Sequence, residues 1–163
     1  MNIKNSKIGL EQFMACKVQV WDFDGVVIES VGIKEEAFIE TLRKCEGIPP
    51  DFADYVRHYH QREGGVSRTK KFQHFKKKFG LSLSVQELCR GFSEFTLARL
   101  KTATLVAGVE TALSPDRYRV IGSAMPQDEL DFLVAHFDLK DYFSFYFGGE
   151  GSKDSACHLA ISY

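Results

Sequence analysis

Two aspartates at the end of an apolar, strand-like run constrain the fold of this chain more than any other feature. The segment VWDFDGVVIES spans Val20 to Ser30, and its Asp22 and Asp24 follow the alternating run CKVQV at residues 16–20. Alternation that stops at an Asp-Gly pair predicts a strand running into a turn. Because two like charges so close together repel each other, the pair needs a cation, a solvated loop or a chemical task.

The region after the aspartates is predicted to be helical. Apolar residues recur near a 3.6-residue period in the segments 33–47, 52–62, 67–79 and 84–101, with glycine or proline at several of the ends. Ser67 is a good N-cap, and Ser84 with Glu87 matches a capping box. The third helix carries a group of lysines that we interpret as a solvated basic face, namely Lys70, Lys71, Lys76, Lys77 and Lys78.

Strand-like segments return after the helices. RYRVIG at residues 117–122 predicts a strand, Pro126 is expected at the first position of the next helix, and residues 143–147 predict a final strand. The pattern favours an α/β core with a parallel sheet and a helical insertion. We assign residues 1–30 and 103–163 to the core and residues 31–102 to the insertion.

Composition excludes several classes of function. The 163 residues contain 21 Lys and Arg against 22 Asp and Glu, a net charge of -1, so no global field favours nucleic acid. No apolar run is long enough to span a membrane, and the segment after Met1 does not resemble a leader peptide. The four cysteines form no Cys-x-x-Cys pair. We therefore expect a cytoplasmic protein that binds neither nucleic acid nor membranes.

Polar groups follow three predicted strands: Asp22 and Asp24, then Ser123, then Lys153 after a glycine-rich run. The carboxyl ends of parallel strands meet at one edge of a sheet, so these side chains should lie together. A carboxylate nucleophile, a second carboxyl, a hydroxyl and an ammonium suit transfer of a phosphoryl group.

The string DFDGVVIES closely resembles the first motif of the haloacid dehalogenase superfamily of phosphatases. Ser123 after YRVIG resembles the second motif, Lys153 in GSKDSA the third, and residues 31–102 the helical cap of phosphoglycolate phosphatase-like members. The resemblance implies a Rossmann-like core in which Asp22 is the nucleophile and Asp24 the general acid and base. It also implies Mg²⁺, held by Asp22 and the backbone carbonyl of Asp24. An acid at the position of Asp24 goes with phosphate esters rather than dehalogenation.

The sequence departs from the family in one important respect. Family members carry a fourth, acidic motif beyond the lysine motif, and we expect that this chain is truncated before it and impaired as an enzyme. Glu150 or Asp154 are candidates to replace the missing metal ligands. Without the strand that follows in the family, the edge at residues 17–22 would be bare, which predicts a homo-oligomer or low stability.

The expected function is hydrolysis of a small phosphorylated metabolite, with Gly25 of the first motif and Arg68 at the start of the third helix as substrate-binding residues. An arginine there could reach the substrate's anionic group. Two alternatives stay open at this point. The chain could be a sugar-phosphate mutase of the same fold, or an inactive relative that binds a phosphorylated ligand or a partner chain.

Overall fold

We call the described residues outside 31–102 the sheet region. A three-stranded parallel sheet lies at its centre. The computed structural model describes residues 16–113 and 117–162. Its strands β1 (Val18–Trp21), β2 (Tyr118–Ser123) and β3 (Phe145–Gly148) stand in the order β1-β2-β3. Trp21 pairs with Ile121, and Ser123 pairs with Gly148, so all three strands end at the same edge. The prediction of an α/β fold with a parallel sheet is confirmed.

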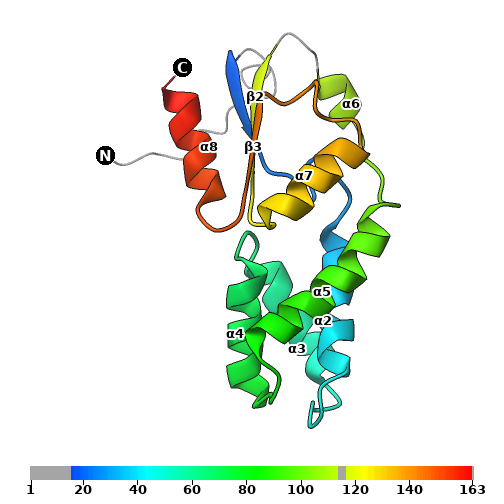
Figure 1. The fold of residues 1–163 in the computed structure, drawn as a ribbon. Helices are drawn as coiled ribbons and strands as arrows, with labels where there is room; N and C mark the ends of the chain where they lie inside the picture. Colours follow the sequence, from blue (N-terminus) through cyan, green and yellow to red (C-terminus); the bar gives the residue numbers. More distant parts are fainter. Residues whose placement is uncertain (1–15, 114–116, 163) are drawn as a thin grey trace.

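Three helices flank this sheet. Helix α8 (Ser152–Ile161) lies on one side of it, and α7 (Gln127–His136) with the short α6 (Val109–Ala112) lies on the other, as Figure 1 shows. The sequence did not predict α6, and Pro126 takes the N-cap position of α7 rather than its first helical position.

Four further helices form a bundle at one end of the sheet, below it in Figure 1. We call α2 (Val31–Arg43), α3 (Phe52–Arg62), α4 (Arg68–Phe79) and α5 (Val85–Leu100) the helical bundle. The Ser67 side chain accepts a hydrogen bond from the Lys70 amide, and Ser84 with Glu87 forms the expected capping box. Gly80 ends α4 with a φ of 65°, a left-handed conformation that favours glycine.

The buried apolar side chains divide into two clusters. One includes Trp21, Phe23, Ile121, Leu130 and Phe143 and lies around the sheet. The other includes Phe38, Phe72, Phe75, Leu88 and Phe92 and lies inside the helical bundle. Each cluster excludes its own apolar surface from water, so each part of the chain contributes separately to the stability.

A buried arginine on β2 is hydrogen-bonded to both β1 and α6. Arg119 on β2 is fully buried, and its guanidinium donates to the Gln19 side chain on β1 at 3.0 Å and to the Ala112 carbonyl of α6 at 3.0 Å. Burial is the main cause that lowers the pKa of Arg119, with the charge of Arg117 adding to it. The outer edge of β1 meets no further strand in the part of the chain that the structure describes.

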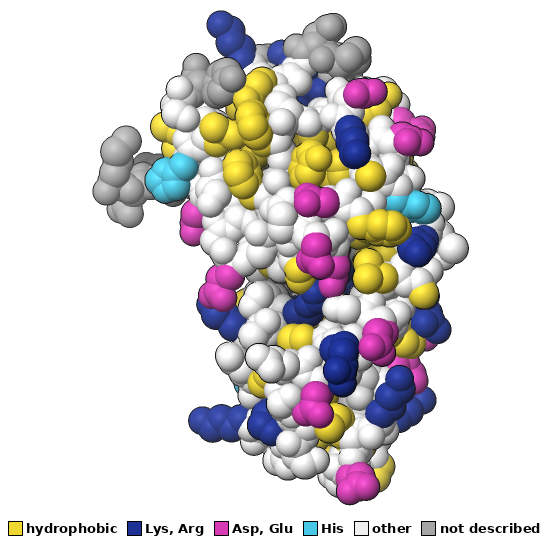
Figure 2. All heavy atoms as spheres, in the orientation of Figure 1, with side chains coloured by type: hydrophobic (Ala, Val, Ile, Leu, Met, Phe, Trp, Pro, Cys, Tyr) yellow, Lys and Arg dark blue, Asp and Glu magenta, His cyan; other side chains and the backbone are white. Residues whose placement is uncertain are grey.

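The surface carries charges of both signs. Figure 2 shows Lys and Arg side chains interspersed with Asp and Glu on the face that it draws, as expected from a net charge of -1. Within residues 16–113 and 117–162, none of the helices has the length and apolar character needed to cross a membrane. The leader-peptide prediction concerns residues 1–15, which lie outside the described residues, as do residues 114–116 and 163 of the assigned core.

Candidate active site

Asp22 and Asp24 lie in the turn that follows β1. The Phe23 amide donates to Asp22 Oδ1 at 2.8 Å, which orients this carboxylate. Gly25 has a φ of 69°, and its amide donates to the Ile28 carbonyl at 2.9 Å. A Cβ at this position would lie 2.7 Å from a methyl of Val31, so both the turn and the packing require glycine. This is a local structural role, and Gly25 does not line the cavity described below.

Lys153 reaches Asp22 from the first turn of α8. Its Nζ donates to Asp22 Oδ2, although 131 residues separate the two in sequence. Helix α8 approaches β2 closely at Gly122, where an added Cβ would lie 3.0 Å from the Lys153 Cα. The Ser152 hydroxyl, which is buried, donates to the Ser123 carbonyl at 2.6 Å. Gly122 and Ser152 thus position the helix that carries the lysine.

Asp24 is surrounded by donors. Its Oδ1 accepts from the Ser30 hydroxyl at 2.8 Å, and its Oδ2 accepts from Lys34 Nζ at 2.6 Å and from the Ser123 hydroxyl at 3.4 Å. Burial by itself would raise the pKa of the Asp24 carboxyl, but the charge of Lys34 and the hydrogen bonds from Lys34, Ser30 and Ser123 outweigh burial and lower it. Asp24 is therefore ionised at neutral pH.

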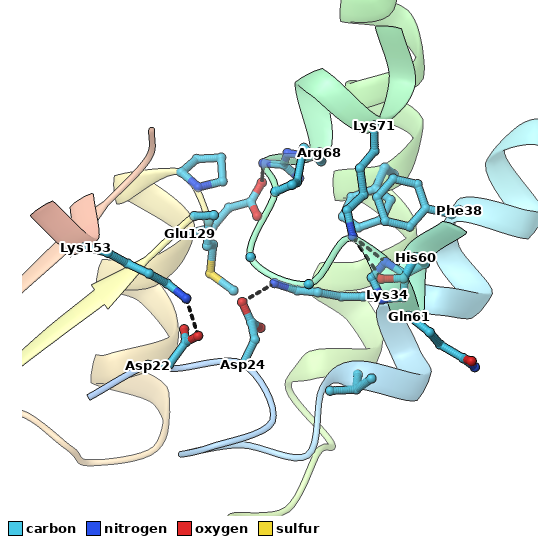
Figure 3. Close-up of a pocket in the computed structure, with 18 residues that line it drawn as sticks. Asp22, Asp24, Lys34, Phe38, His60, Gln61, Arg68, Lys71, Glu129 and Lys153 are labelled. Atoms are coloured by element: carbon cyan, nitrogen blue, oxygen red, sulfur yellow. Dashed lines mark hydrogen bonds and ion pairs between the residues drawn. The ribbon is translucent and has the colours of Figure 1, made fainter. Parts of the chain in front are cut away.

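A cavity of about 370 Å³ lies between the sheet and the helical bundle. The sheet region contributes Asp22, Asp24, Glu129 and Lys153 to its wall, and the bundle contributes side chains that include Lys34, Phe38, His60, Arg68, Lys71 and Phe92. Figure 3 shows the two aspartates on one side and Lys71 with His60 on the other, with Lys34 extending between them. A small molecule in this cavity would touch both parts of the chain.

Arg68 lines the cavity, but its guanidinium already binds other side chains of the protein. Its guanidinium donates to Glu129 Oε1 at 2.5 Å and to the Ser93 hydroxyl at 2.8 Å, and it lies 5.4 Å from the centre of the Phe92 ring. Glu129 belongs to α7, so this pair joins the helical bundle to the sheet region. A substrate anion could reach Arg68 only in competition with Glu129.

Four of the six site residues predicted from the sequence therefore line one cavity: Asp22, Asp24, Arg68 and Lys153. Ser123 is buried beside Asp24, and its hydroxyl also accepts from the Met125 amide at 3.2 Å, so it contacts the aspartate rather than the open cavity. Gly25, the sixth predicted site residue, does not line the cavity.

Among the titratable residues of the cavity wall, sequence reasoning missed Lys34, His60, Lys71 and Glu129. The interpretation of Lys71 as part of a solvated face is wrong, because this residue is only 3% exposed. It faces inward since it lies next to Phe72 and one turn before Phe75 on the packed side of α4. Lys34 could have been suspected from the sequence, because it lies four residues after Ser30, in the first turn of α2 and close in sequence to the turn that carries Asp24.

The oxygen atoms of Asp22 and Asp24 suit a magnesium site with few protein ligands. Mg²⁺ in proteins often keeps several waters and takes one or two carboxylates together with a substrate phosphate. Asp22 and the backbone carbonyl of Asp24 could serve in this way, although no group of three or more potential ligands occurs among the described residues. Glu150 and Asp154, the suggested replacements, do not line the cavity, and Glu150 pairs with Lys70 instead.

Comparison with known proteins identifies the fold. No protein-family model matches the chain, and no curated protein is significantly similar to it in sequence. Solved structures do match. A haloacid dehalogenase-like hydrolase from Streptococcus pneumoniae aligns over 90% of this chain and 69% of its own, with a TM-score of 0.65 and 17% identity. CbbY from Rhodobacter sphaeroides, solved with phosphate, aligns over 90% and 73%, with a TM-score of 0.70 and 12% identity.

A third solved structure, described as a β-phosphoglucomutase from Thermotoga maritima, aligns over 90% of this chain and 70% of its own, with a TM-score of 0.61 and 17% identity. At such identities the likeness concerns the fold. The chain has the haloacid dehalogenase-like fold, and the resemblance that DFDGVVIES indicated is confirmed at that level.

Proposed function

We propose that this chain is a phosphatase that hydrolyses small phosphate monoesters through an aspartyl phosphate on Asp22. The observation that carries the proposal is the pairing of Asp22 with Lys153 beside Asp24, at the end of three parallel strands and inside a cavity of suitable size. Ligands in open parallel sheets bind at this edge.

Asp22 is the proposed nucleophile. One of its oxygens attacks phosphorus, so a new O–P bond forms while the ester O–P bond breaks and the alcohol leaves. The Phe23 amide and Lys153 hold the carboxylate in place. The ammonium of Lys153 also lies where it can neutralise the phosphoryl oxygens.

Asp24 is the proposed acid and base. The minor protonated form of Asp24 gives its proton to the alcohol oxygen as the alcohol leaves, and the carboxylate that remains takes a proton from the water that later hydrolyses the aspartyl phosphate. The lowered pKa of Asp24 favours its ionised form, which is the form that accepts the proton from water. Ser30 and Ser123 fix its orientation through hydrogen bonds from two different segments of the chain.

Magnesium would be held by Asp22 and the backbone carbonyl of Asp24. When bound, it would supply positive charge that balances the phosphate and the two carboxylates. Because these residues offer few ligands, we expect weak binding of the metal and an activity that rises with its concentration up to the millimolar range.

The helical bundle is the proposed cap, covering residues 31–102, and the remainder is the proposed core. The ion pair of Arg68 with Glu129 joins bundle and sheet region at the wall of the cavity, and the exposed pair of Lys70 with Glu150 joins them outside it. Closure of this kind excludes water from the reacting groups and lets the cap select the substrate.

The experiment that tests the function is hydrolysis of an aryl phosphate with and without Mg²⁺. Magnesium-dependent activity should fall by about 10³-fold or more in Asp22→Asn, since the amide cannot act as nucleophile. The matched control is Glu29→Gln, which changes an exposed carboxylate in the same loop that does not line the cavity.

Folded wild-type protein that hydrolyses no phosphate ester would contradict the phosphatase and favour an inactive relative. Equal activity of the wild type and Asp22→Asn would overturn the role of Asp22. Arg68→Ala should raise KM far more than it lowers kcat if the guanidinium leaves Glu129 to bind substrate; equal effects would argue against that role.

A further inference from the structure

Charge is divided unequally between the two parts of the chain. Residues 31–102, which include the helical bundle, contain 14 Lys and Arg against 9 Asp and Glu, and the rest of the sequence contains 7 against 13. The segment with the bundle is therefore positive at neutral pH and the remainder is negative. The net charge of -1 for the whole chain conceals this difference. Opposite charges on two such bodies attract each other, and dissolved salt screens that attraction.

The ion pairs between the two parts follow the same division. Three of them join the bundle to the sheet region: Lys34 with Asp24 at 2.6 Å, Arg68 with Glu129 at 2.5 Å, and Lys70 with Glu150. In each pair the cation belongs to the bundle and the carboxylate belongs to the sheet region. The hydroxyl of Ser93 on α5 also donates to Glu129, at 2.9 Å. All of these contacts thus bring a carboxylate of the sheet region to a donor of the bundle.

The wall of the cavity has the same polarity. Among its described residues, the bundle contributes three cations and no carboxylate, namely Lys34, Arg68 and Lys71. The sheet region contributes three carboxylates and one cation, namely Asp22, Asp24, Glu129 and Lys153. Figure 3 shows the aspartates of the sheet region opposite Lys71 of the bundle. The two faces of the cavity therefore attract each other while it is closed.

Apolar contacts, in contrast, lie mostly within each part. The cluster inside the bundle includes Phe38 and Phe72 and contains no residue of the sheet region. Ile33 near the start of α2 and Leu100 at the end of α5 do pack with the cluster around the sheet. Both lie where the chain passes from one part to the other. Apolar contact thus joins the two parts at these crossings, and the contacts that close the cavity are charged.

We propose that attraction between opposite charges, rather than apolar contact, holds the bundle closed against the sheet region, so that the cavity opens as the ionic strength rises. This inference concerns access to the cavity and does not depend on a reaction at Asp22. Screening should act most strongly on Lys70 with Glu150, because their side chains are 57% and 65% exposed.

The test measures opening through the reactivity of a buried amine. Lys71 lines the cavity and is only 3% exposed, whereas Lys77 on the same helix is exposed. The chain is treated briefly with an amine-acetylating reagent at constant pH, and acetylation of Lys71 relative to Lys77 is measured by peptide mass spectrometry. The ratio should rise roughly 10-fold between about 20 mM and about 0.5 M sodium chloride. An interface held by apolar contact would give a constant ratio, since screening acts on charges.

Reversal of one charge provides the second measurement. Glu150→Lys places a cation opposite Lys70, so the ratio at low salt should rise roughly 3-fold or more. Adding Lys70→Glu restores an attractive pair and should bring the ratio back toward the wild-type value. The matched control is Asp141→Lys, which makes the same change in net charge at an exposed acid that precedes β3, at the end of the sheet away from the cavity. Its effect on the ratio should be much smaller.

A ratio that does not rise with salt in the wild type would overturn the proposal. Equal ratios for Glu150→Lys and Asp141→Lys at low salt, with both variants verified as folded by thermal unfolding, would overturn it as well. If adding Lys70→Glu failed to lower the ratio of Glu150→Lys, the pair would have no part in closure. Acetylation does not require turnover, so these results are separate from the hydrolysis assay.

Discussion

At the scale of single residues, the two neighbouring carboxylates coexist because each has its own lysine. Asp22 pairs with Lys153 of α8, and Asp24 pairs with Lys34 of α2. Two lysines from different helices thus offset the repulsion between the two carboxylates. A motif indicated Lys153 in advance, whereas Lys34 belongs to no motif and is placed against Asp24 by the start of α2.

Removing Lys34 should destabilise the protein. In Lys34→Met the partly buried carboxylate of Asp24 keeps its charge and loses its cation, which should lower the free energy of unfolding by about 1–3 kcal/mol. Urea unfolding in a chelator measures this change. Adding Asp24→Asn to Lys34→Met should recover part of the loss, because the uncompensated charge is then absent.

The control for this experiment is Arg43→Met, which removes an exposed partner of Glu40 on the same helix. Exposed pairs contribute little, so we expect a change below about 0.5 kcal/mol. If Lys34→Met changed stability no more than Arg43→Met, the lysine would not be compensating the charge of Asp24.

His60 should make the stability depend on pH. Its pKa is about 4 in the folded chain, against 6.5 for an ordinary histidine, so the folded state binds fewer protons between these values. Stability contributed by neutral His60 is therefore fully present above pH 6.5 and lost as the pH falls toward 4. With allowance for partial solvent screening, the loss should be on the order of 1–2 kcal/mol.

The variant His60→Gln keeps a hydrogen-bond acceptor but cannot be protonated. Its free energy of unfolding should fall less steeply than that of the wild type across this pH window, as measured by urea unfolding at a series of pH values. Parallel slopes for both proteins would show that His60 titrates in the folded chain as it does in the unfolded chain.

At the scale of elements, the ion pair of Arg68 with Glu129 is one of the contacts that connect the helical bundle to the sheet region. Arg68 opens α4, Glu129 lies in the first turn of α7, and Ser93 of α5 donates to the same carboxylate at 2.9 Å. Both partners are largely buried, with 12% and 9% of their side chains exposed. Such a contact can hold the cavity closed, and a substrate that engages Arg68 would weaken it.

Breaking this contact should loosen the joint between α3 and α4. In Glu129→Gln the amide keeps the shape but loses the charge, so amides of residues 64–67 should exchange with deuterium roughly 10-fold faster. Asp128→Asn is the matched control, because Asp128 is an exposed acid in the same turn. Equal exchange in Glu129→Gln and Asp128→Asn would mean that closure does not depend on the pair.

The sequence was most informative where a local rule applies. Ser84 with Glu87, Ser67 and Gly80 mark helix ends through hydrogen bonds and backbone conformation within a few residues, and the structure has them as expected. For Lys71, in contrast, the local pattern predicted the wrong degree of exposure. Its neighbours in sequence include several solvated lysines, but the packing of Phe72 and Phe75 against α2 and α5 decides which side of α4 is buried. Contacts of this kind depend on the tertiary arrangement.

At the scale of the whole molecule, the site exists because two separately packed parts face each other. The sheet region positions the two carboxylates that we propose to react, and the helical bundle supplies the opposite wall of the cavity. The motif residues could be predicted from order along the chain, while the bundle residues His60 and Lys71 could not, because they belong to no motif. Within residues 16–113 and 117–162 no strand pairs with the outer edge of β1, and self-association through this edge stays a prediction.

The most direct test of the central claim is to look for the phosphoryl group on Asp22. The chain is mixed with magnesium and a phosphate monoester, quenched in acid and analysed by intact-mass and peptide mass spectrometry. We predict an adduct of one phosphoryl group on the peptide that contains Asp22, which accumulates in Asp24→Asn because water is no longer activated, and which is absent in Asp22→Asn. Hydrolysis without this adduct in Asp24→Asn, or an adduct on another residue, would contradict the account.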